Sequence, residues 1–63
     1  MLIFITAWTG GYESPQYVVS DSYNEAEHIA NEWSREAEHG VDTIAVLCID
    51  TQTMTIRTEA ELF

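Results

Sequence analysis

The chain has no lysine, and its 63 residues include only two arginines, one cysteine and one proline. So few bases cannot form the cationic surface with which proteins grip phosphate backbones, which excludes direct binding of DNA or RNA. A single cysteine excludes a disulfide framework within the chain, and this cysteine usage suits a reducing cytoplasm.

The sequence also lacks a long apolar run. The start "MLIFITAW" stays apolar for only about five residues and has no basic leader, whereas a membrane span needs about 20 apolar residues. We therefore predict a cytoplasmic protein without a signal peptide or a membrane-spanning segment.

Acidic residues are abundant. Eleven aspartates and glutamates against two arginines give a net charge of −9, and 46% of the residues are hydrophobic. That hydrophobic content is too high for a disordered chain and predicts one globular domain over residues 1–63. A domain of this size buries only about 60% of the surface that its unfolded chain exposes, so dimerisation would stabilise it. The charge favours partners with basic surfaces and opposes binding to anionic membranes.

Four segments have the composition of β-strands. Residues 2–9 and 41–50 are rich in β-branched and apolar side chains, as in central strands, and residues 17–20 form a shorter segment of the same kind. Residues 53–59 alternate between apolar and polar, as a half-buried strand does. A Gly-Gly pair and the proline separate the first two segments and predict a hairpin loop.

The segment between the second and third strands predicts a helix. Ser22 followed by Glu25 forms a capping box, and Gly40 is a suitable residue just beyond the helix C-terminus. At 100° per residue the apolar side chains fall within a sector of about 120°, and all charged side chains lie outside it. This apolar stripe consists of Tyr23, Ala26, Ile29, Ala30, Trp33 and Ala37.

The element order ββαββ predicts an α+β fold, a four-stranded sheet with one amphipathic helix packed on one face. This layout is similar to the small β-grasp domain of protein G. One helix covers one face only, so either Ile3 and Ile5 or their even-numbered neighbours face away from it. Uncovered apolar side chains mark partner or dimer interfaces, and Phe4, Trp8 and Tyr17 are the candidates for such a surface.

No residue pattern indicates catalysis. Cys48 lies between apolar residues of a predicted strand, which suits a buried, inert thiol. The Gly-Gly pair has neither the lysine nor the strand-loop-helix setting of a phosphate-binding loop. We predict a protein that is not an enzyme and has no cofactor.

Two histidines and two glutamates fall on one side of the predicted helix. His28, Glu32, Glu36 and His39 are spaced at i, i+4, i+8 and i+11. Histidine and carboxylate at i, i+4 can bind zinc, but a closed site needs converging ligands from other elements, and the sequence offers none. We therefore interpret these residues as a solvated helix face and predict no metal site.

The acidic side chains of the helix and its flanks are the main functional candidates. Duplex DNA carries one negative charge per about 1.7 Å of its axis, and rows of carboxylates along a helix imitate that field coarsely. The alternative is a solvated face, but surfaces that serve solubility alone usually mix both signs. The candidate partner-binding residues are Glu13, Asp21, Glu25, Glu27, Glu32, Glu36 and Glu38.

The stretches "ESPQYVVSDSYNEAEHIANEW" and "VDTIAVLCI" carry a family resemblance. They combine a proline-containing hairpin, a tyrosine-bearing strand, a helix of the form S-x-x-E-A-x-x-x-A-x-E-W and a valine-rich strand with a cysteine. This combination resembles small phage-encoded host-takeover inhibitors, nearest the T7-type inhibitors of bacterial RNA polymerase. The resemblance implies a small viral protein that binds a host polymerase and blocks its engagement with DNA.

Composition and resemblance together favour a small acidic inhibitor that binds a basic nucleic-acid-handling site on a host protein, acting as a DNA mimic in the host cytoplasm. A polymerase, a nuclease, a restriction or CRISPR complex, or a glycosylase would all offer such a site. The alternative is a non-catalytic interaction module or homodimer that uses the uncovered apolar sheet face.

Overall fold

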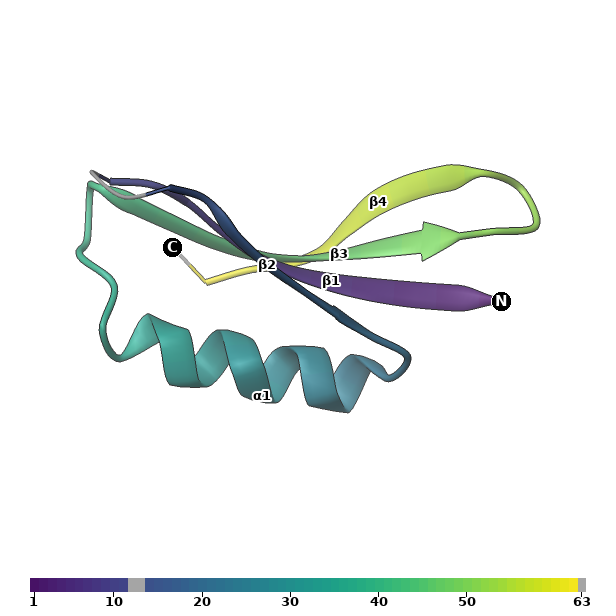
Figure 1. The fold of residues 1–63 in the computed structure, drawn as a ribbon, viewed down its shortest axis with the longest axis horizontal. Coiled ribbons are helices and arrows are strands. Elements are labelled where there is room, and N and C mark those ends of the chain that lie inside the picture. Colours follow the sequence, from purple (N-terminus) through teal and green to yellow (C-terminus); the bar gives the residue numbers. More distant parts are fainter. Residues whose placement is uncertain (12–13, 63) are drawn as a thin grey trace.

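A computed structural model describes residues 1–11 and 14–62 of the chain. The elements follow the predicted order ββαββ, with one helix under one face of a four-stranded sheet (Figure 1). Their bounds are β1 Leu2–Gly10, β2 Gln16–Ser20, α1 Tyr23–Ser34, β3 Asp42–Asp50 and β4 Thr55–Glu61. The α+β prediction is confirmed. The last strand begins and ends two residues later than predicted.

The sheet has the strand order β2-β1-β3-β4, and every pairing is antiparallel. Strands β2 and β3 therefore run in the same direction with β1 between them, and α1 is the crossover that joins them. In a β-grasp the first and last strands pair in parallel at the centre of the sheet. Here β1 pairs with β3 and β4 lies at an edge, so the likeness to the β-grasp is limited to the order of the elements.

The core lies between α1 and the two central strands. Ile44 and Val46 of β3 are fully buried against Ala26 and Ala30 of the helix. The alanines let the helix approach the sheet closely, and at that contact the Thr6 hydroxyl donates a hydrogen bond of 2.9 Å to the Ala26 carbonyl oxygen. A buried hydroxyl needs such a partner, so the bond fixes which face of β1 meets the helix.

The helix begins as the sequence predicts but ends early. The Ser22 side chain caps it by accepting a 3.2 Å hydrogen bond from the backbone N–H of Glu25. The prediction that it continues as far as the residue before Gly40 was wrong, because α1 ends at Ser34. In a longer helix the Glu38 N–H would bond the Ser34 carbonyl, but it donates to the Asp42 carboxylate at 2.8 Å instead.

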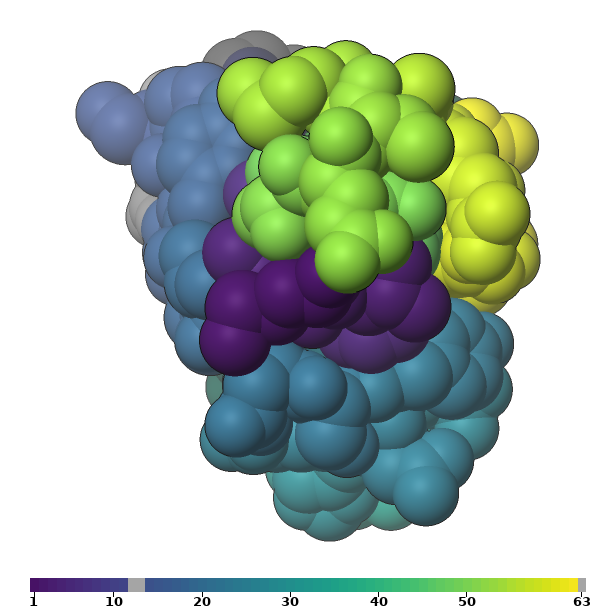
Figure 2. All heavy atoms as spheres, turned by 90° about the vertical axis from the view of Figure 1, so that its right-hand side faces the viewer, coloured from purple at the N-terminus to yellow at the C-terminus, as the bar shows by residue number. Residues whose placement is uncertain are grey.

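The β3–β4 turn follows Asp50, the last residue of β3. The Asp50 carboxylate accepts hydrogen bonds from the backbone N–H groups of Gln52 and Thr53, at 2.9 and 3.4 Å. The bond from Gln52 is the main cause that lowers the pKa of Asp50. Figure 2 shows this turn against the start of the chain, where Thr51 donates through both its N–H and its hydroxyl to the Met1 carbonyl oxygen.

Candidate protein-binding surfaces

Six predicted acidic residues lie on the helix side of the molecule and all are exposed. We call this set the acidic layer; it consists of Asp21, Glu25, Glu27, Glu32, Glu36 and Glu38. The seventh candidate, Glu13, lies outside the described residues. The six share one layer but not one helix, because Glu36 and Glu38 follow the helix end and belong to the loop before β3.

Within α1, Glu25 and Glu32 are two turns apart and lie on the same side of the helix, separated by about 10 Å along its axis. Glu27 lies on another side, where its carboxylate accepts a 2.9 Å hydrogen bond from the Tyr23 hydroxyl. That bond is the main cause that raises the pKa of Tyr23. The acidic side chains therefore do not form the predicted continuous rows along one helix. Glu25, Glu27 and Glu32 lie on α1, and Glu36 and Glu38 lie in the loop that follows it.

Both arginines are already paired with glutamates. Arg35 lies 3.6 Å from Glu32, and Arg57 donates to Glu59. The bond to Glu59 raises the pKa of Arg57. Such exposed pairs add little stability, but they neutralise two carboxylates locally. The remaining members of the acidic layer keep a charge that is uncompensated by any arginine.

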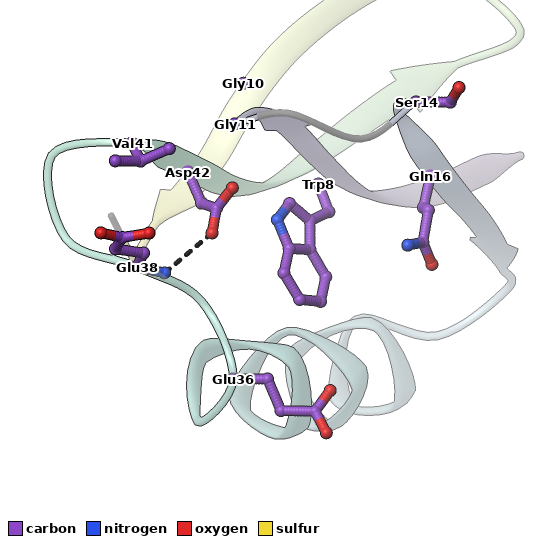
Figure 3. Close-up of a pocket in the computed structure, with 9 residues that line it drawn as sticks. All are labelled: Trp8, Gly10, Gly11, Ser14, Gln16, Glu36, Glu38, Val41 and Asp42. Atoms are coloured by element: carbon purple, nitrogen blue, oxygen red, sulfur yellow. Dashed lines mark hydrogen bonds between the residues drawn. The ribbon is translucent and has the colours of Figure 1, made fainter.

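A cavity of about 300 Å³ opens where the loop after α1 meets the ends of β1 and β2 (Figure 3). Glu36 and Asp42 line it on either side of the Trp8 indole, and Glu38 lines it with its carboxylate turned away from Trp8. Gln16 and Ser14 from the β2 side, Gly10, Gly11 and Val41 complete its lining.

The close approach of two backbones holds this cavity together. The Gly11 N–H donates to the Val41 carbonyl at 2.9 Å, and a Cβ at Gly11 would collide with the Asp42 carboxylate. The sequence analysis did not identify Asp42 as a lining residue of this cavity. The Gly10–Gly11 pair was the one sequence feature that pointed to it. Two positive-φ glycines at a strand end permit an approach that a side chain would block.

The sheet face opposite α1 carries no described helix or strand (Figure 1). Phe4 and Trp8 were predicted as candidates for this face, and that prediction was wrong. Phe4 packs edge-on against Tyr23 of the helix, with 5.8 Å between the ring centroids. Trp8 packs against Trp33, with 5.7 Å between the ring centroids. Side chains alternate along β1, so Phe4 and Trp8 share the face of Thr6, which bonds to the helix.

Tyr17 does lie on the open face, with an exposed fraction of 60%. The register places it across from Ala7, and Val19 across from Ile5. By the same alternation, this face also carries side chains from β1, β3 and β4. We call this set the open sheet face; it consists of Ile3, Ile5, Ala7, Tyr17, Val19, Ala45, Leu47, Ile49 and Ile56.

The residues considered for catalysis or metal binding are Cys48 and the set of two histidines and two glutamates. Cys48 is 2% exposed and packs in the helix-facing core, as predicted. Because α1 ends at Ser34, the helical spacing assumed for Glu36 and His39 does not exist. In residues 1–11 and 14–62, no group of three histidine, cysteine, aspartate or glutamate side chains is placed to hold a metal ion.

Neither a scan against protein-family models nor searches of curated proteins and of solved structures gave a match to this chain. Among the described residues, no helix has both the length and the apolar character needed to span a membrane.

Proposed function

We propose that the protein is a small acidic inhibitor, of viral origin as the resemblance implies, that occupies the nucleic-acid-binding site of a host enzyme. The observation that carries the proposal is the acidic layer, six exposed carboxylates accompanied by a single arginine. A basic cleft that holds DNA would attract this layer, and the bound protein would exclude DNA sterically and electrostatically. In this mechanism the protein blocks the site by binding and catalyses no reaction.

The test is displacement of DNA from purified enzymes that handle it, with bacterial RNA polymerase first and a nuclease, a restriction enzyme, a CRISPR effector and a glycosylase beside it. Fluorescence anisotropy of labelled DNA measures the displacement. We expect the protein to displace DNA from at least one of these enzymes, with affinity at least about tenfold weaker at 200 than at 50 mM salt. No displacement across the panel, or displacement insensitive to salt, would contradict the proposal.

Charge reversal at Glu32 provides the matched variant. Glu32→Lys and Glu61→Lys each replace −1 by +1 and so change the net charge from −9 to −7. Glu32 belongs to the acidic layer, whereas Glu61 lies on β4 across from Ala45. We expect Glu32→Lys to weaken DNA displacement about tenfold and Glu61→Lys about twofold. Equal losses would show that only the net charge matters.

A second candidate function rests on the open sheet face. Val19 and Ile56 are each 67% exposed there, and the face is apolar along β1, β2 and β3 up to Glu61, which lies across from Ala45 at the end of β4. Two copies with a net charge of −9 would repel one another through the acidic layer but could pack through this face. We propose a homodimer, or an interaction module that meets an apolar partner, as the alternative.

Val19→Glu tests the alternative, because it places a charge on the open sheet face at an exposed position. Gln52→Glu is the control, since it adds the same charge at an exposed position in the β3–β4 turn. Sedimentation equilibrium is expected to show a dimer for the natural chain and Gln52→Glu, and a monomer for Val19→Glu. If the natural chain stays monomeric at concentrations up to about 100 μM, any dimer would be weaker than nearly all specific dimers. That result would exclude the homodimer.

A further inference from the structure

We infer that the cavity beside Trp8 is a socket for one arginine side chain of a protein partner. The inference deepens the proposed function and rests on it for the partner, while the socket itself is defined by this chain alone. A guanidinium group would lie against the Trp8 indole and donate hydrogen bonds to the surrounding carboxylates. The volume of about 300 Å³ exceeds what one guanidinium needs and leaves an open path for the arginine stem.

The charge of the cavity selects a cation. Glu36 from the loop after α1 and Asp42 from the start of β3 line it with their carboxylates, while Glu38 contributes its backbone N–H, which bonds Asp42. In the part of the chain that the structure describes, the Glu36 carboxylate accepts no hydrogen bond and forms no ion pair. Neither arginine of the chain is available to fill the cavity, because Arg35 pairs with Glu32 and Arg57 with Glu59.

The aromatic wall selects the kind of cation. Trp8 is half-buried, its ring packs against Trp33 at 5.7 Å, and its remaining surface lines the cavity. The π-face of an indole attracts cations more strongly than that of any other aromatic side chain. A planar guanidinium can stack on it and still donate sideways to carboxylates, which the compact ammonium of lysine cannot do.

The socket is organised before any partner arrives. The Asp42 carboxylate is held by the 2.8 Å bond from the Glu38 N–H, and the Gly11–Val41 hydrogen bond of 2.9 Å ties the hairpin end to the same loop. Gln16 stands on the far side of the indole from Asp42 (Figure 3) and offers an amide oxygen as a further acceptor. Acceptors that are already fixed need not be ordered on binding, which lowers the entropy cost of forming the complex.

The position of the socket explains why it suits the proposed function. Glu36 and Glu38 are members of both the acidic layer and the cavity, so a protein surface that meets the layer also meets the socket mouth. Basic clefts that hold nucleic acid are rich in arginine. The long-range charge of the layer would attract such a cleft, and a single inserted arginine would fix the register.

The socket can be tested without any enzyme by nuclear magnetic resonance. The probe is the capped tripeptide acetyl-Gly-Arg-Gly-amide, and the readout is the indole N–H signal of Trp8, assigned by comparison with a Trp33→Phe variant. Acetyl-Gly-citrulline-Gly-amide has nearly the same shape without the charge, and acetyl-Gly-Lys-Gly-amide has the charge without the plane. We expect saturable shifts of the Trp8 signal with the arginine peptide, with a Kd on the order of 1 mM.

Lysine is expected to bind about threefold more weakly, and citrulline more than tenfold more weakly. Glu36→Gln should weaken arginine binding about fivefold, whereas the control Glu25→Gln removes the same charge from the helix and should leave it unchanged. Equal binding of citrulline or lysine, or equal losses in the two variants, would overturn the socket.

The two proposals fail separately. If the socket fails while DNA displacement by the natural chain remains, the acidic layer acts without an arginine anchor. If the Trp8 signal responds as expected while no enzyme of the panel is displaced from DNA, the socket stands and the proposed inhibitor function is wrong.

Discussion

Replacing Ile44 by alanine is expected to remove most of the stability of the fold. Ile44 is fully buried where β3 meets α1, and truncating such a side chain costs about 2–5 kcal/mol. At the usual stability per residue, a chain of this length has about 3–9 kcal/mol in all. Urea denaturation followed by circular dichroism would measure the loss, and heating should show a melting temperature lower by at least about 10 °C.

Ile56→Ala is the matched control, because it makes the same change of side chain at a position that is 67% exposed. On the edge strand β4 it should cost less than about 1 kcal/mol. A loss as large as that of Ile44→Ala would contradict the burial pattern of the monomer. It would also mean that Ile56 is covered in solution, which only an assembly through the open sheet face would explain.

Gly10→Ala is expected to have the second largest effect. Gly10 has φ +80°, and a Cβ there would lie 2.6 Å from the Val41 carbonyl oxygen. The left-handed conformation alone costs an alanine about 1–2 kcal/mol. The contact with a backbone oxygen cannot be relieved by a side-chain rotation, so we expect about 1–3 kcal/mol more. The same urea denaturation measures the sum.

Gly40→Ala separates the two costs. Gly40 has φ +81°, nearly the same conformation, but nothing lies within 4 Å of an added Cβ. It should therefore show only the conformational cost of about 1–2 kcal/mol. The gain from a less flexible unfolded chain is common to both variants and cancels in the comparison. Equal destabilisation by the two variants would contradict the steric cost at Gly10. It would show that β1 and the loop before β3 can move apart to accommodate the added Cβ.

The fold could be predicted well because its signals are local. Alternation and β-branched content defined the strands, and the Ser22 cap with the Ala26 and Ala30 stripe defined the helix and its buried side. The helix end could not be predicted from Gly40, because a contact from Asp42 competes for the Glu38 N–H. That contact is formed only when β3 is in place, so it is invisible in the local pattern.

The candidate surfaces were predictable only in part. Exposure of the glutamates followed from their places outside the apolar stripe. Which face of β1 meets the helix did not, since bulky side chains alternate on both sides of that strand. Thr6 decided it through a hydrogen bond to the Ala26 carbonyl, and a threonine in a strand carries no sign of such a bond. For the same reason Trp8 was assigned to the wrong face and the socket was missed.

The central position of β1 has a consequence for synthesis of the protein on the ribosome. β1 is made first, and β2 can pair with it at once, but its other edge waits for β3, about 40 residues later in the chain. Contacts of such high sequence separation slow folding, and an unpaired apolar edge invites association with other chains. The acidic helix is made between the two strands, so by the time β3 emerges the nascent chain already carries the charge that keeps its neighbours away.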